Sequence, residues 1–163
     1  MTRKALTYFR WGFVLLFMNF NIGYPDLLPD FLGVMLILWA LKSQEMTETE
    51  HRLCPLLLLL VIDYFLHWFL DFDNVLENLI IEVISTYTMY VLLGEMSKRV
   101  QNTQPDLAES LHHIRIAMTV LSVAGYLMSP YETAMLLAIL AFVMVIVLIY
   151  LLWLLFKIKP MDS

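Results

Sequence analysis

Long apolar blocks separated by short polar segments run along the whole chain. A helix needs about 20 mostly apolar residues to cross a hydrocarbon core of about 30 Å. The chain therefore predicts six membrane-spanning helices, at residues 8–24, 27–41, 54–72, 75–96, 112–128 and 133–156. Short connections predict antiparallel hairpins, so we expect one all-α transmembrane domain over residues 1–163. Within the second inner loop, Pro105 and Asp106 indicate the start of a helix.

The composition agrees with a membrane protein. Of the 163 residues, 61% are hydrophobic and only 15% are charged, and the mean hydropathy is +0.75. About a quarter of the residues of an ordinary soluble domain are charged. These proportions exclude a soluble globular enzyme and a disordered chain, and the net charge of −5 argues against a nucleic-acid partner. With Cys54 as the single cysteine, a disulfide scaffold is excluded as well.

The charged residues orient the predicted spans. With both termini in the cytoplasm, all ten Lys and Arg residues fall on the inner side of the six-span bundle, which satisfies the positive-inside rule. The predicted outer half carries no basic residue, and its acidic residues are Asp26, Asp30, Asp63, Asp71, Asp73, Glu77, Glu82 and Glu132.

The first predicted hairpin is too short for two perpendicular crossings. Residues 8–42 make roughly 52 Å of helix, whereas two crossings need about 60 Å before any turn. Two prolines and two glycines interrupt the helical pattern between residues 19 and 33. The turn is therefore expected below the outer surface. There it either lines a cavity covered by protein or thins the bilayer locally.

This hairpin carries a recognisable motif. The runs Asn19-Phe20-Asn21-Ile22-Gly23 and Asp26-Leu27-Leu28-Pro29-Asp30-Phe31-Leu32-Gly33 resemble a group of small, uncharacterised multi-pass membrane proteins of Gram-positive bacteria. The N-terminal hairpin of that group has an Asp-Leu-Leu-Pro-Asp-Phe-x-Gly signature, and many members have Tyr where this chain has Val34. The resemblance does not extend beyond Leu41. It implies a bacterial plasma membrane and no particular activity.

Polar residues spaced by four mark one face of the third span and one face of the fourth. They are Asp63, His67 and Asp71 in the third span and Asn78, Glu82 and Thr86 in the fourth. Counted outward from a turn near Asp73, His67 is level with Asn78, and Asp63 is level with Glu82. Asp63 would then lie roughly 13 Å below the turn, near the bilayer centre.

A carboxylate at that depth needs a compensating partner. An ionised, unpaired carboxylate there costs at least about 2.5 kcal/mol, and no Lys or Arg lies at this level. Asp63 and Glu82 could share a proton or bind a cation, with His67 in support. The alternative is a protonated Asp63 that hydrogen-bonds between helices, with His67 as an ordinary core residue.

These considerations define a candidate site for a ligand or a proton. Its predicted members are Asp63, Glu82, His67, Asp30, Asn21, Asn19, Asp26 and Asn78. A metal ion, if one binds, would be held by Asp63, His67 and Glu82. No cofactor is expected. The chain has no His-Glu-x-x-His or Gly-x-Ser-x-Gly motif and no phosphate-binding glycine loop, so an enzyme is the less favoured interpretation.

The last two spans contain small residues, including Gly125 and Ala138, which permit close approach of the two helices. The sixth span has no charged residue between Glu132 and Lys157, so it is expected to face lipid or a second copy of the chain.

Two functions fit this sequence. The favoured one is a plasma-membrane protein whose outward-facing acidic cavity binds, senses or transports a proton, a metal cation or a cationic small molecule. The alternative is a non-catalytic accessory or immunity-type subunit. Such a subunit would act through helix contacts with a larger membrane protein or as a homo-oligomer.

Overall fold

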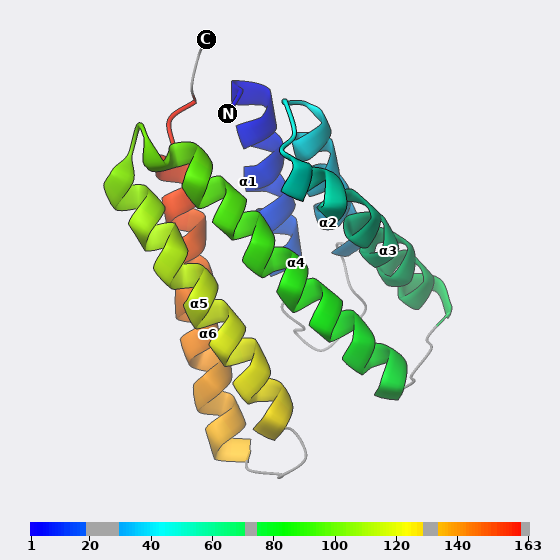
Figure 1. Ribbon diagram of the computed structural model, residues 1–163. Helices are drawn as coiled ribbons and strands as arrows, with labels where there is room; N and C mark the ends of the chain where they lie inside the picture. Colours follow the sequence, from blue (N-terminus) through cyan, green and yellow to red (C-terminus); the bar gives the residue numbers. More distant parts are fainter. Residues whose placement is uncertain (19–29, 71–74, 129–133, 161–163) are drawn as a thin grey trace. The chain divides into compact units, whose positions relative to one another are not determined.

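The computed structural model describes residues 1–18, 30–70, 75–128 and 134–160, and these residues form six α-helices and no strand (Figure 1). The predicted all-α class is confirmed. The helices are α1 (Arg3–Met18), α2 (Asp30–Lys42), α3 (Glu48–Leu70), α4 (Val75–Gln101), α5 (Pro105–Met128) and α6 (Ala134–Lys157). The chain divides into two compact units. Unit 1 comprises Met1–Thr88 and the C-terminal residues from Lys159, and unit 2 comprises Met89–Ile158, so that helix α4 contributes to both.

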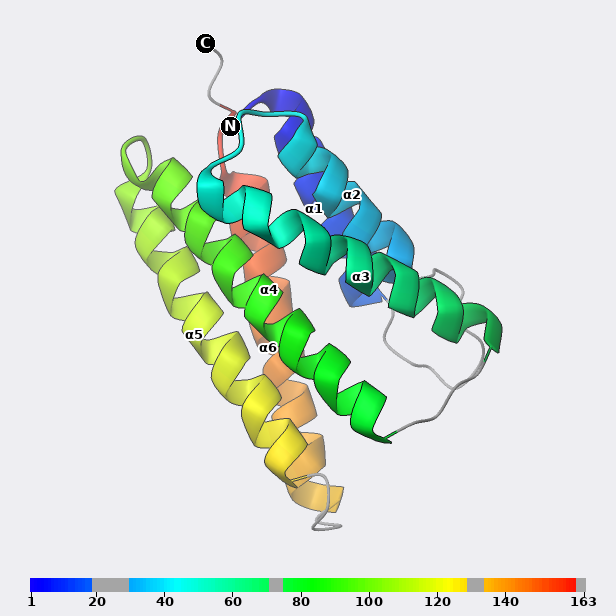
Figure 2. The ribbon, with the colours of Figure 1, turned by 45° about the vertical axis from the view of Figure 1, so that its right-hand side comes forward.

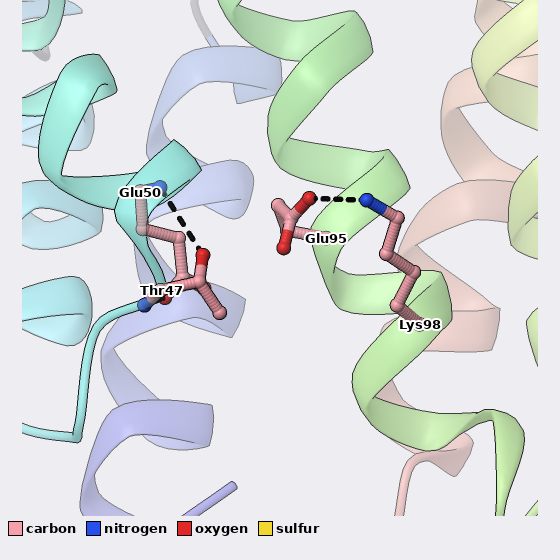
Figure 3. A network of polar contacts seen from close by, with 4 residues as sticks. All are labelled: Thr47, Glu50, Glu95 and Lys98. Atoms are coloured by element: carbon pink, nitrogen blue, oxygen red, sulfur yellow. Dashed lines mark hydrogen bonds and ion pairs between the residues drawn. The ribbon is translucent and has the colours of Figure 1, made fainter.

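Helix α3 begins at Glu48, before the predicted start of the third span at Cys54. The Thr47 N–H donates to Glu50 Oε2 at 2.8 Å, and the Glu50 N–H donates to Thr47 Oγ1 at 3.2 Å (Figure 3). This reciprocal pair is a capping box, which satisfies two backbone donors that a helix start leaves without partners. Much of the inner loop predicted at residues 42–53 is therefore helix.

The second predicted inner loop, at residues 97–111, is also shorter than expected. Helix α4 continues to Gln101, and α5 begins at Pro105 with Asp106 in its first turn, as the sequence indicated. The Ser97 hydroxyl donates to the Ala108 carbonyl at 2.7 Å and joins the two helices. On α4, Lys98 forms an ion pair with Glu95 at 2.7 Å (Figure 3).

Two glycines allow helices α1 and α2 to pack closely in unit 1. The two helices lie side by side in both views (Figures 1 and 2). A Cβ added at Gly12 would lie 2.8 Å from the Gly33 carbonyl oxygen, and a Cβ at Gly33 would lie 2.8 Å from the Gly12 carbonyl oxygen. Phe9, Phe13 and Ile37 are buried on these helices. The backbones therefore approach at a point where any larger residue would collide.

Among the described residues, no neighbour approaches closely at Gly125, although its small size would permit it. Helices α5 and α6 pack against each other in unit 2, but a Cβ at Gly125 would meet no atom within 4 Å. Small residues permit close approach without requiring it. Here the pair of glycines that face each other lies on α1 and α2 instead.

Within the described residues, three helices are long and apolar enough to cross a membrane: α4 from Leu76, α5, and α6 from Met135. Large apolar side chains lie on their outer surfaces, for example Met135, Phe142 and Ile149, which are 81%, 67% and 62% exposed. Dense exposure of this kind is suited to lipid and unfavourable in water.

The first three helices differ from these. Helices α1 and α2 have 16 and 13 residues, or about 24 and 20 Å of helix, which is less than the hydrocarbon thickness of about 30 Å. Helix α3 has 23 residues but carries charges at Glu50, Arg52 and Asp63. The predicted recessed turn falls on residues 19–29, which lie outside the described residues, and the six-span topology remains a prediction.

Replacing Gly12 by Ala should destabilise the α1–α2 pair, because the new methyl group would meet the backbone oxygen of Gly33. We expect a loss of about 1–3 kcal/mol in the free energy of unfolding, measured by denaturant titration in mixed micelles. The matched control is Gly125→Ala, which has open space and should be neutral or stabilising by up to about 1 kcal/mol. Equal effects of the two substitutions would contradict close packing at Gly12.

Replacing Thr47 by Ala should remove the side-chain half of the capping box and cost about 1 kcal/mol in the same unfolding titration. Thr49→Ala is the control, because Thr49 is an exposed threonine in the first turn of the same helix. If both substitutions had the same effect, the cap would contribute nothing specific.

Candidate functional site

A group of polar side chains lies where α2 begins, α3 nears its end and α4 begins. Asp30 is the first residue of α2, and the neighbouring Phe31 ring packs edge-on against Phe65 of α3 with centroids 5.2 Å apart. The Tyr64 hydroxyl of α3 donates to Ser85 Oγ of α4 at 3.3 Å. These contacts bring parts of three helices together within unit 1.

Three side chains from α3 and α4 converge at this place. Asp63, His67 and Glu77 each offer one ligand atom, and these atoms all lie within 4.8 Å of one another. Asp63 and His67 are one turn apart on α3, and Glu77 lies in the first turn of α4. All three residues are half-buried. We call Asp63, His67 and Glu77 the acid–histidine cluster.

The surroundings of His67 orient its ring. Its Nδ1 lies 3.2 Å from the Asp63 carbonyl oxygen and 3.5 Å from Asp63 Oδ2. Both neighbouring oxygens can accept a hydrogen bond, which favours the tautomer with the proton on Nδ1. Its Nε2 is buried and has no hydrogen-bond partner among the described residues, which leaves the Nε2 lone pair available. Histidines that bind metals commonly donate their other ring N–H to a carbonyl or carboxylate in this way.

Further acidic residues surround the cluster. Asp30, Asp63 and Glu82 all lie near enough to the Tyr64 hydroxyl to act on it electrostatically, and Glu77 acts on Asp63 in the same way. Within the described part of the chain, no lysine or arginine is among the groups acting on Asp63 or Tyr64. Among the described residues, the acidic groups are therefore gathered around His67 without a lysine or arginine, an arrangement that attracts cations.

The α4 residue that lies beside Asp63 and His67 is Glu77 and not the predicted Glu82. The α4 residues that meet α3 are Glu77 and Ser85, which lie on one face two turns apart. Glu82 lies about 140° around the helix from Glu77, whereas Asn78 lies within about 20° of Ser85, and both residues are exposed. Glu82 is thus not brought into the acid–histidine cluster, and Glu77 stands where Glu82 was predicted.

The sequence would have indicated Glu77 if the end of α3 and the start of α4 had been predicted correctly. His67 lies three residues before the end of α3, and Glu77 lies two residues after the start of α4, so the two are nearly level in an antiparallel hairpin. Counting levels outward from Asp73, with faces compared by the spacing within each helix alone, places Glu82 level with Asp63 instead. Of the other predicted members, Asp30 lies beside Tyr64, whereas Asn19, Asn21 and Asp26 fall outside the described residues.

The donor set determines which ions the cluster suits. One imidazole nitrogen and two carboxylates suit ions such as Zn²⁺ and Mn²⁺. Three protein ligands would leave at least one coordination position for water or another ligand.

Comparison of the chain with family models, with curated proteins and with solved structures finds no match.

Proposed function

We propose that this chain is a bacterial plasma-membrane protein that binds a divalent metal cation through Asp63, His67 and Glu77. The observation that carries the proposal is the convergence of these three side chains, from two helices, within 4.8 Å. Along the sequence, Glu77 is separated from His67 by the connection between α3 and α4, so helix periodicity alone does not bring them together.

A metal ion fits this geometry better than a proton. A shared proton needs only two acceptors, whereas this cluster adds an imidazole whose Nε2 has no hydrogen-bond partner among the described residues. Bonds of about 2.0–2.2 Å to a tetrahedral ion would hold the ligand atoms about 3.4 Å apart.

The proposed topology has six spans with both termini in the cytoplasm, which places the acid–histidine cluster in the outer half. Two lysines that each lie over an aromatic ring near the end of a helix support this topology. Lys4 lies over the Tyr8 ring at 5.9 Å, and Tyr8 meets Trp39 edge-on at 6.4 Å between centroids. Aromatic rings and lysines at helix ends are typical of membrane interfaces.

The second such contact lies at the end of α6. Lys157 Nζ lies 3.5 Å from the centre of the Trp153 ring, which stacks on Tyr150 at 5.6 Å. The positive-inside rule assigns the ends that carry Lys4 and Lys157 to the cytoplasm. A cation would therefore reach the acid–histidine cluster from outside the cell.

Metal binding can be measured by isothermal titration calorimetry, with Zn²⁺ or Mn²⁺ titrated into the purified full chain in detergent. Asp63→Asn and Glu77→Gln should each weaken the affinity by at least about 10-fold, because each removes a charged ligand atom. Glu82→Gln is the matched control and should change the Kd by less than about 3-fold, a change worth roughly 0.6 kcal/mol.

Several results would contradict the metal site. One is undiminished binding in the Asp63→Asn, Glu77→Gln double variant. Another is a wild-type chain that binds neither ion. Wild-type protein that binds no cation but purifies with a stoichiometric membrane partner would favour the accessory-subunit alternative.

The topology can be tested with single cysteines in a Cys54→Ser background. Asn102→Cys lies between α4 and α5 and should react with an impermeant maleimide only after the cells are permeabilised. Asp73→Cys, in a predicted outer turn, should react in intact cells. The reverse pattern of labelling would overturn the proposed orientation.

A further inference from the structure

Arg115 is a basic residue inside a helix that is apolar and long enough to span a membrane. Its guanidinium carbon lies over the Tyr90 ring of α4, 4.7 Å from the ring centre. A Cβ at Gly94 would overlap the guanidinium, so the absence of a side chain there leaves the space that Arg115 occupies. All three residues belong to unit 2.

Within the described residues, this arginine has no acidic partner. In the part of the chain that the structure describes, Arg115 forms no ion pair, and its Nε is buried without a hydrogen-bond partner. Glu95, the acid next to Gly94, is already paired with Lys98 at 2.7 Å. A cation in a spanning helix is costly unless it is paired. The Tyr90 ring attracts the positive charge but supplies no acceptor for the N–H groups at the guanidinium edge.

The position of Arg115 along α5 shows where an acceptor could come from. Side chains on a helix lean toward its N-terminus, so the guanidinium reaches back toward Pro105. His112 and His113 lie within one turn of Arg115 on that side, and both are exposed. A long basic side chain placed just inside the hydrocarbon in this way extends to the headgroup layer.

We propose that Arg115 binds the phosphate group of an anionic phospholipid. The planar guanidinium presents parallel N–H donors that match two phosphate oxygens. Tyr90 covers one face of the guanidinium, and the absence of a side chain at Gly94 leaves room for the guanidinium itself. The assignment of this lipid to the inner leaflet rests on the proposed topology, whereas the phosphate contact itself does not. The site is independent of the acid–histidine cluster.

The test is native mass spectrometry of the purified full chain with phosphatidylglycerol or phosphatidylcholine in the detergent. One phosphatidylglycerol should remain bound to the wild type, with at least about 5-fold preference over phosphatidylcholine, equivalent to about 1 kcal/mol. Arg115→Gln should abolish the preference. Arg52→Gln removes the same charge from an exposed position on α3 and should keep the preference.

Two more variants separate the phosphate contact from a structural role. Arg115→Lys keeps the charge but loses the paired donors, and Gly94→Ala keeps Arg115 but fills its space. Both should remain folded by size-exclusion chromatography and should bind phosphatidylglycerol more weakly than the wild type. Full binding in Arg115→Gln, or equal retention of both lipids by the wild type, would overturn the proposal. Displacement of the lipid by millimolar inorganic phosphate would overturn the lipid as the source of the phosphate group.

Discussion

The cost of placing charge in hydrocarbon without a partner is the constraint on which the rest of this structure depends. Because lipid offers no hydrogen bonds, helices α4 to α6 place apolar side chains such as Phe142 and Ile149 outward. Several polar groups in the described residues form pairs along a helix or between helices, as Glu95 does with Lys98 and Tyr64 does with Ser85. Because of the same constraint, a charged group without an oppositely charged partner points to a candidate ligand site.

In the part of the chain that the structure describes, two groups of side chains gather charge of opposite sign. Among the described residues, the acid–histidine cluster gathers two carboxylates and an imidazole without a lysine or arginine, and Arg115 rests on a tyrosine ring without an acidic partner. Each is most simply satisfied by a ligand from outside the chain: a metal cation for the first and a lipid phosphate for the second. The proposed metal site and the proposed lipid site therefore rest on the same physical argument.

Much of the fold followed from local signals in the sequence. Apolar blocks predicted helices, and Pro105 with Asp106 marked the start of α5. The boundaries were less accurate, because the charged segments before α3 and after α4 were interpreted as loops. Thr47 and Glu50 have the spacing of a capping box, which marks the start of α3 in the sequence. The apolar pattern, which begins later, favoured a start at Cys54 instead.

The sequence by itself determined the helical class, the segregation of charge along the chain and the pairing of Asp63 with His67. These follow from composition and from the fixed 100° step of a single helix. Only the tertiary structure decided that Glu77 rather than Glu82 joins that pair, and that Gly12 and Gly33 rather than Gly125 meet a neighbouring helix. The rotation and approach of one helix against another depend on the sum of many side-chain contacts, which spacing within one helix does not encode.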